Sequence, residues 1–326
     1  MSLPTTEDLC TIPAGVSPDG QYNFENPTTL GPAVISLGVI LCTISVILTV
    51  GRVYTNRRRL LSADYFTVAA LVFNIGFTAI LLSSAYFGPM RTIFLQPSMY
   101  RHQWDIPLCW FTPSYFKRLY VQETFFAPVY FTSKTAIFLL YRQLFAVKKW
   151  MRYAIIGGII FTFLLYFPNI PLAAIYSAPR VGEPWSSILT SNGPFKMITY
   201  SIVMASGSTL LDIYIFLLPL PIVARLHMPL GRRLQLIGVF GTALMGVTAS
   251  ALSLVYRVQL LDATDTLWPQ SIVSICALVE SNVAIIVGCM PGFAQLLKLH
   301  AGGSNFFKSL RSRVRDMVGD SSNNSS

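Results

Sequence analysis

The stretch WPQSIVSICALVESNVAIIVGCMPGFAQLL, from Trp268 to Leu297, decides the fold. Glu280 is its one charged residue. A helix of about 20 residues crosses the ~30 Å hydrocarbon core of a bilayer, so this stretch is long enough to span it. An ionised carboxyl group is costly in hydrocarbon, so we expect Glu280 to face polar partners inside a helix bundle.

The whole chain has the composition of a membrane protein. Of its 326 residues, 53% are hydrophobic and 12% are charged, whereas a soluble domain carries about 25% charged residues. Six more apolar stretches are long enough to cross a bilayer: Gly31 to Val50, Tyr65 to Phe87, Val121 to Leu144, Tyr153 to Tyr176, Met197 to Ala224 and Leu234 to Tyr256. None shows the alternation of barrel strands. We therefore predict an all-α fold, a polytopic bundle of seven transmembrane helices.

Positive charge is distributed unevenly between the predicted loops. One set of loops and the C-terminal tail contain Arg52, Arg57, Arg58, Arg59, Arg142, Lys148, Lys149, Arg152, Arg225, Arg232, Arg233, Lys298, Lys308, Arg311, Arg313 and Arg315. The smaller opposite group is Arg91, Arg101, Lys117, Arg118, Arg180, Lys196 and Arg257. By the positive-inside rule the N-terminus is outside and the C-terminus is cytoplasmic. A basic rim beside anionic lipid accounts for the net charge of +10 without a nucleic-acid partner.

The chain divides into three parts: a polar extracytoplasmic tail at 1–29, the membrane domain at 30–298 and a cytoplasmic tail at 299–326. Within the last part, Ser304 to Asp320 has apolar residues at helical spacing, which predicts a short amphipathic helix on the membrane surface. Cys10 and Cys109 both fall on the outer side, where a disulfide between them is one reading.

Three ionisable residues lie at similar middle to inner depth in different predicted spans. They are Lys134, Asp212 and Glu280, and Asn282 follows close behind the last of them. One reading is structural, with Lys134 paired to Asp212 or Glu280 to hold helices in register. The other is functional: an unpaired carboxyl group in an apolar site becomes a neutral acid, with Glu280 or Asp212 as the candidate catalytic acid and Asn282 orienting it.

Two prolines follow Asp212 within one span. Pro219-Leu220-Pro221 removes two backbone donors, so we expect a kink there. Its role is either to shape the bundle or to act as a hinge between Asp212 and the inner loop.

Several runs of sequence together resemble a known family. They are GRVYTNRRRLLSADYF (Gly51 to Phe66), KTAIFLLYRQLF (Lys134 to Phe145), DIYIFLLPLPIVARLHMPLGRR (Asp212 to Arg233) and WPQSIVSICALVESNVAIIVGCMPGF (Trp268 to Phe293). These runs are similar to the fungal rhodopsin-domain integral membrane proteins, a family that includes satratoxin-cluster membrane proteins and plant-infection receptor-like proteins. The chain departs from the family in having no cysteine at Tyr176 to Trp185 and no cysteine-rich N-terminal domain.

The resemblance implies a seven-helix protein of filamentous fungi, often encoded in secondary-metabolite clusters. It does not imply retinal, because opsins form their Schiff base with a lysine in the last helix. Here the predicted last span has no lysine before Lys298, and Lys134 lies in the third.

Three functional classes remain open. The first, which we favour, is a pathway protein acting on a lipophilic metabolite in a polar intramembrane pocket, by acid-catalysed cyclisation or isomerisation. The second is a receptor-like sensor that couples an external ligand to a cytoplasmic partner. The third is a transporter, or a scaffold for pathway enzymes. An endomembrane location suits the first class and a plasma-membrane location suits the second.

The sequence does not favour a metal or cofactor. No paired Asp-rich prenyl-diphosphate motif or His-rich iron box is present, and His102, His227 and His300 are scattered. The expected partners are the lipid bilayer, a lipophilic small molecule and other pathway enzymes.

Overall fold

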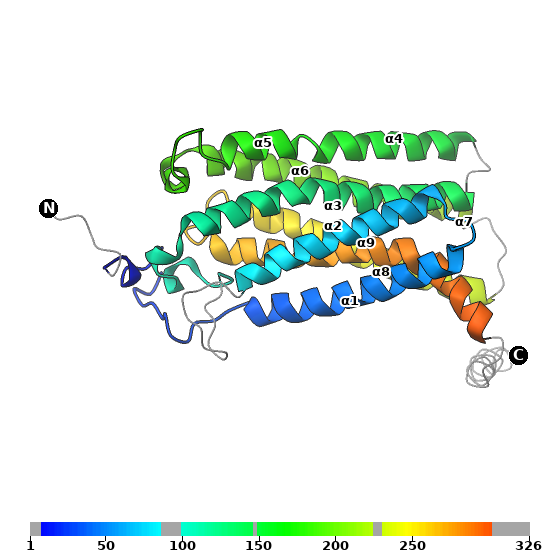
Figure 1. Ribbon diagram of the computed structural model, residues 1–326, viewed down its shortest axis with the longest axis horizontal. Coiled ribbons are helices and arrows are strands. Elements are labelled where there is room, and N and C mark those ends of the chain that lie inside the picture. Colours follow the sequence, from blue (N-terminus) through cyan, green and yellow to red (C-terminus); the bar gives the residue numbers. More distant parts are fainter. Residues whose placement is uncertain (1–7, 86–98, 146–148, 224–229, 302–326) are drawn as a thin grey trace, which may run out of the picture.

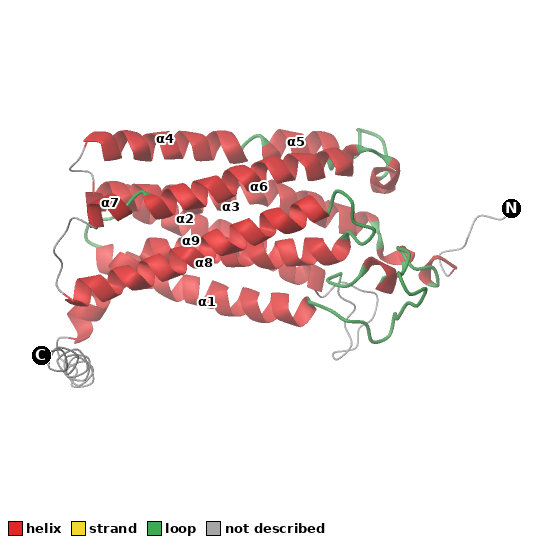
Figure 2. Cartoon of the chain, turned by 180° about the vertical axis from the view of Figure 1, so that it is seen from behind, coloured by secondary structure: helices red, strands yellow, loops and turns green. Residues whose placement is uncertain are grey.

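The computed structural model describes residues 8–85, 99–145, 149–223 and 230–301. Its long helices lie side by side along the long axis of the molecule (Figure 1). In chain order the helices are α1 (Gly31–Asn56), α2 (Ser62–Ala85), α3 (Pro113–Phe145), α4 (Lys149–Tyr166), α5 (Asn169–Tyr176), α6 (Gly193–Leu217), α7 (Leu220–Val223), α8 (Leu230–Gln259) and α9 (Leu267–Ala301). The described part of the chain forms no strand (Figure 2), so the predicted all-α fold is confirmed.

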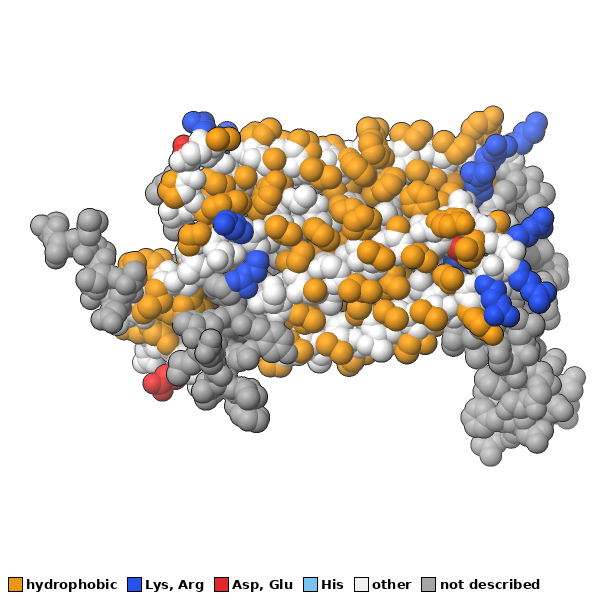
Figure 3. Space-filling view, in the orientation of Figure 1, with side chains coloured by type: hydrophobic (Ala, Val, Ile, Leu, Met, Phe, Trp, Pro, Cys, Tyr) orange, Lys and Arg blue, Asp and Glu red, His pale blue; other side chains and the backbone are white. Residues whose placement is uncertain are grey.

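The chain is an integral, multi-pass membrane protein. Six helical segments are long and apolar enough to cross a bilayer: Gly31–Asn56, Ser62–Ala85, Lys149–Tyr176, Gly193–Leu217, Phe240–Gln259 and Leu267–Gly292. Figure 3 shows apolar side chains along the sides of the bundle and Lys and Arg gathered mainly at the end where the C-terminus lies. The remaining long helix, α3, is less apolar because it carries Lys117, Arg118, Glu123, Lys134 and Arg142.

Helix α9 forms the centre of the bundle. In its most apolar 18-residue stretch 83% of residues are buried, compared with 22–33% in the other five apolar segments. It packs against α1, α2, α3 and α8. The helix that contains Glu280 is therefore shielded from lipid by its neighbours, which explains how the carboxyl group is tolerated.

Proline interrupts two of the predicted spans. The predicted span Tyr153 to Tyr176 is divided at Pro168 into α4 and α5, and α6 ends at Leu217 just before Pro219. Pro219 has no N–H to donate to the carbonyl of Ile215, four residues earlier. The hydroxyl of Tyr141 on α3 donates to that carbonyl instead, at 3.2 Å. This hydrogen bond joins α3 to the end of α6 where the proline interrupts the helix.

The loops at one end of the bundle form a cap over it. Residues 8–30 run along residues 99–112 and are joined to them by the Cys10–Cys109 disulfide. Backbone hydrogen bonds link Ala14 to Ile106 and Leu30 to Tyr100. We call this the capped end, and the opposite end, where α9 reaches Ala301, the C-terminal end. The predicted amphipathic helix at Ser304 to Asp320 lies outside the described residues.

The cap is also fixed to the start of α9. The ring of His102 stacks between Trp104 and Trp268, with centroid distances of 4.6 and 4.1 Å. Its Nδ1 lies 2.6 Å from the carboxylate of Asp265, just before α9 begins. These contacts fix the position of the first turn of α9, and therefore the depth of Glu280 along the bundle.

Candidate functional site: an ion-paired cluster beside a cavity

The three ionisable residues singled out in the sequence meet in the middle of the bundle. Lys134 on α3 places its Nζ 2.7 Å from Asp212 Oδ1 on α6 and 3.0 Å from Glu280 Oε1 on α9. The side chains of Lys134, Asp212 and Glu280 are 1%, 13% and 7% exposed. Lys134 therefore pairs with both acids, whereas the sequence left the choice between them open.

Hydroxyl groups complete the cluster. Ser208, one turn before Asp212 on α6, donates to Glu280 Oε1 at 2.9 Å and accepts from Lys134 Nζ at 2.9 Å. A serine hydroxyl has one proton, so the 2.7 Å contact between Ser208 and Tyr166 requires Tyr166 to donate. The hydroxyl of Tyr130 lies 3.3 Å from Glu280 Oε2. Of the two oxygens of Glu280, Oε1 is thus the more strongly held.

Asp212 differs from Glu280 in the number of its partners. Its Oδ1 accepts from Lys134, but its Oδ2 is buried and has no hydrogen-bond partner among the described residues. Both oxygens of Glu280 have partners. The two acids are therefore not equivalent, although the sequence placed them in the same role.

Asn282 does not orient Glu280 in the described structure. Its Oδ1 accepts from Ser45 on α1 and Asn74 on α2, each at 2.9 Å, and its Nδ2 donates to the Leu278 carbonyl. Residues two apart on a helix point about 200° away from each other, which puts Asn282 on another face of α9. It fastens α1 and α2 to α9 instead.

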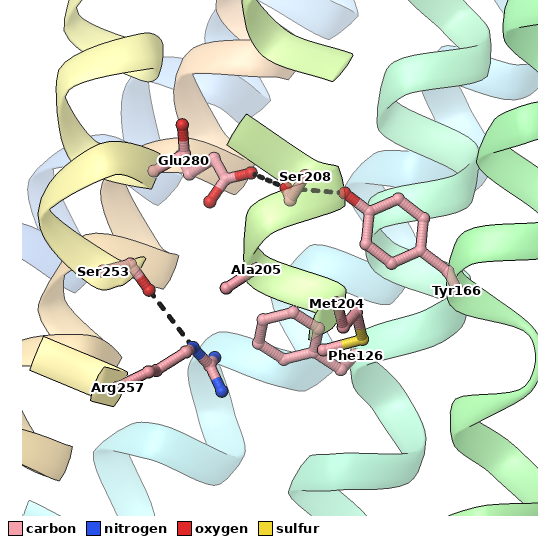
Figure 4. A pocket seen from close by; sticks show the side chains of 9 residues that line it. Phe126, Tyr166, Met204, Ala205, Ser208, Ser253, Arg257 and Glu280 are labelled. Atoms are coloured by element: carbon pink, nitrogen blue, oxygen red, sulfur yellow. Dashed lines mark hydrogen bonds between the residues drawn. The ribbon is translucent and has the colours of Figure 1, made fainter. Parts of the chain in front are cut away.

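A cavity lies beside the cluster. Its empty volume, including the part open to the outside, is about 250 Å³. It is lined by Phe126, Tyr166, Met204, Ala205, Ser208, Ser250, Ser253, Arg257 and Glu280. Figure 4 shows Glu280 and Arg257 reaching into this space from α9 and α8, with Phe126 and Met204 across from Arg257. Of the three ionisable residues in the cluster, Glu280 is the one in the cavity wall.

The residues of this site that were not predicted include Ser208, Ser253 and Arg257. In the sequence, Arg257 is grouped with the cations of the outer loops, but it is 8% exposed and lies within α8. A signal for it was present, because Ser250, Ser253 and Arg257 fall at i, i+3 and i+7 and so share one face of a helix. Ser208 likewise shares a face with Asp212.

A second buried ion pair lies at the C-terminal end. Arg52 on α1 donates from Nε to Asp64 Oδ1 of α2 at 2.7 Å, and the two side chains are 2% and 1% exposed. Arg52 also donates to the Gly288 carbonyl of α9. Asp64 accepts two more hydrogen bonds, from Asn56 and from the Leu61 backbone N–H. Arg52 is therefore part of the core, not of the basic rim to which its sequence position assigned it.

Pro219 and Pro221 lie in the short segment between α6 and the end of α7 (Leu220–Val223). Pro219 is buried and Pro221 is exposed. Among the described residues, no group of three or more His, Cys, Asp or Glu side chains is placed to hold a metal ion.

Comparison with known proteins gives the family. The profile described as Fungal rhodopsin domain matches residues 47–299, from within α1 to near the end of α9. The chain belongs to the fungal rhodopsin domain family. A SAT4 family membrane protein from Emericella nidulans is 27% identical over 203 residues, which are 62% of this chain and 50% of that protein. The chain thus spans about half the length of this curated relative. No solved structure matches this chain.

Proposed function

We propose that this protein acts in a fungal secondary-metabolite pathway and moves a proton on a lipophilic intermediate bound in the cavity beside Glu280. The observation that carries the proposal is the position of Glu280, which belongs both to the charged cluster and to the wall of the cavity. The rings of Phe126 and Tyr166 in the same wall suit an apolar ligand. The family resemblance suggests the class of pathway.

Glu280 has one oxygen suited to exchange a proton with a ligand. Its Oε1 is occupied by Lys134 and Ser208, while Oε2 has only the 3.3 Å contact with Tyr130 and a carboxylate oxygen can accept more than one hydrogen bond. Lys134 and Ser208 hold the side chain in one orientation. Asp212 does not line the cavity, so its role is to hold Lys134 in place.

Isomerisation fits these contacts better than acid-initiated cyclisation. Lys134, Ser208 and Tyr130 all present donors to Glu280, which matches a carboxylate that acts first as a base. The carboxylate would remove a proton from a carbon next to a carbonyl group, and the electron pair would move toward the carbonyl oxygen. In a ligand with a double bond next to that carbon, the electron pair would return from the oxygen through the chain, and the neutral Glu280 would give the proton to the far carbon of the former double bond. The double bond shifts into conjugation with the carbonyl group, and the ligand is neither oxidised nor reduced.

We also propose that the chain crosses the membrane seven times, with the capped end on the extracytoplasmic side. Helix α3 has 33 residues and at 1.5 Å per residue is about 50 Å long, which exceeds the hydrocarbon thickness. The Cys10–Cys109 disulfide at the capped end suits an oxidising compartment. An epitope at the N-terminus should be accessible without permeabilising the membrane, and one at the C-terminus only afterwards. The reverse pattern would overturn this orientation.

We also propose that Pro219 and Pro221 act as a hinge between α6 and α7. Helix α6 ends five residues after Asp212, so a movement of α7 at this point can reach the charged cluster. Pro219→Ala restores the missing N–H and allows α6 to continue. We expect this variant to fold and to lower pathway flux; unchanged flux would leave the prolines with a shaping role only.

The experiment that tests the pathway role is metabolite profiling of the producing strain with and without the gene. The proposal predicts that one discrete intermediate accumulates in the deletion strain and is cleared when the wild-type gene is returned. Unchanged metabolites would contradict it. Metabolites that fall together with the transcripts of their enzymes would also contradict it, and would favour the receptor-like alternative.

A further inference from the structure

Arg257 carries a buried charge for which the described residues provide no close counter-ion. Its side chain is 8% exposed, yet no carboxylate oxygen of a described residue lies within the 4.0 Å limit for an ion pair. Arginine is almost never buried without a partner, because removing its charge from water is costly. The residue therefore has donors available for a group that is not part of the bundle.

The contacts that Arg257 does make hold it in place without neutralising it. Its Nε donates to Ser253 Oγ at 3.4 Å, one turn back on α8. Its guanidinium carbon lies 5.5 Å from the centre of the Phe126 ring. A cation–π contact contributes only about 0.5–2 kcal/mol, which is less than the cost of burying an unpaired charge. Two acids, Glu280 and Glu123, attract the charge from a distance, but neither lies within 4.0 Å of it, and Glu280 is already paired with Lys134.

We propose that Arg257 binds the carboxylate head of a lipophilic ligand in the cavity, which makes the ligand class an apolar carboxylic acid. This inference rests on the proposed function and names the substrate class for the same site. A guanidinium presents a planar fork of N–H groups that matches a carboxylate with two parallel hydrogen bonds. The hydroxyls of Ser250 and Ser253 lie on the same face of α8 and line the same space.

The arrangement also gives the ligand a direction. In Figure 4, Arg257 and Glu280 are separated along the cavity, with Ala205 between them and the Phe126 ring facing Arg257. A carboxylate held at Arg257 leaves the apolar body against Phe126 and Met204. The carbons beyond the head group then face Glu280. Binding the head at one end and moving the proton at the other keeps the head group apart from Glu280.

The size of the cavity sets the size of a suitable probe. As described, the cavity has room for only about one water molecule, within an empty volume of about 250 Å³ that includes open space. A bound ligand therefore has to displace side chains of the wall, so the probe has to be small and rigid. We choose 2-naphthoate, with 2-naphthalenemethanol as a neutral probe of matched shape. Binding is measured by titration calorimetry on the full-length protein in lipid nanodiscs, in chloride-free buffer, with empty nanodiscs as the blank.

The inference predicts that wild-type protein binds 2-naphthoate at least tenfold more tightly than the alcohol. Arg257→Gln should abolish this preference, and Arg257→Lys should keep part of it. Arg180→Gln, which removes an exposed cation in the loop after α5, is the matched control and should behave as wild type. If Arg257→Gln fails to fold, Ser253→Ala tests the same point, because loss of the hydrogen bond to Nε should weaken naphthoate binding severalfold.

Three results would overturn the inference: equal affinity for the acid and the alcohol, a preference that survives Arg257→Gln, or chloride binding as tightly as naphthoate. The last result would indicate a site for a small inorganic anion. The profiling experiment tests the proposed function separately. If the protein binds naphthoate through Arg257 but deletion of its gene leaves the metabolites unchanged, the binding site stands and the pathway role is refuted.

Discussion

The two buried ion-pair clusters of the bundle differ in what surrounds them. At the C-terminal end, Arg52 and Asp64 are enclosed: the acid accepts from three donors and the arginine reaches a backbone carbonyl of α9. In the middle, Glu280 pairs with Lys134 but also faces a cavity that Arg257 enters from the other side. The residue types are nearly the same, and the difference lies in the empty space beside them.

This difference separates a structural ion pair from a candidate functional one. A fully satisfied pair can hold α1, α2 and α9 together but offers no atom to a ligand. The central cluster also joins helices, yet leaves Glu280 Oε2 and the Arg257 donors facing an open volume. Buried charge alone therefore does not mark a candidate site, whereas buried charge next to a cavity does.

The largest effect is expected for Lys134→Met. The substitution leaves the buried carboxyl groups of Asp212 and Glu280 without their shared counter-ion. Because removing one partner of a buried ion pair costs about 3–5 kcal/mol, the free energy of unfolding should fall by about 5 kcal/mol. Thermal unfolding in nanodiscs measures this. The triple variant Lys134→Met, Asp212→Asn, Glu280→Gln should recover most of the lost stability without recovering pathway function. A triple variant as unstable as Lys134→Met would refute this account of the cluster.

The next effect is expected for Arg52→Met at the C-terminal end. Asp64 would lose its counter-ion but keep its hydrogen bonds from Asn56 and Leu61, so we expect a loss of about 3 kcal/mol. The control is Arg58→Met, which removes an exposed cation. At matched protein levels the metabolite profile should stay normal. A specific loss of pathway function in Arg52→Met would break the distinction between the two clusters.

The smallest effect on stability is expected for Ala205→Val, which adds volume at the cavity wall. Overpacking a filled core costs about 1–3 kcal/mol, and the cavity beside Ala205 has room for only about one water molecule, so the loss of stability should be about 1 kcal/mol, at the low end of this range. Naphthoate binding should weaken severalfold. The control is Gly157→Ala on α4, where an added Cβ meets no atom within 4 Å. Unchanged naphthoate binding in Ala205→Val would indicate that the ligand does not occupy this space.

Part of this site could be predicted from the sequence for a clear physical reason. Charges within apolar runs are rare and costly, so Lys134, Asp212 and Glu280 stood out, and their similar depth predicted that they could meet. Depth along a helix does not give direction around it. That is why Asn282, two residues from Glu280, was placed with it although it points to α1 and α2.

Asn282 was assigned to the site but lies outside it, whereas Arg257 was assigned to a loop but lies at the site. It lies two residues before the end of α8, where a cation is ordinarily assigned to the membrane rim. Which side of that helix faces the bundle depends on the packing of α8 against α6 and α9, and no single span contains that information. The division of the span Tyr153 to Tyr176 at Pro168 was missed for a simpler reason, since its hydropathy is continuous across the proline.

The measurement that tests the central claim most directly is the complementation of the deletion strain with Glu280→Gln at matched protein levels. Gln keeps the volume of Glu and can still accept from Lys134, but it cannot exchange a proton. General acid–base groups contribute about 10²–10⁴-fold to rate, so the intermediate should accumulate nearly as in the deletion strain while the protein remains folded. A Glu280→Gln strain that clears the intermediate as fast as wild type would contradict the account.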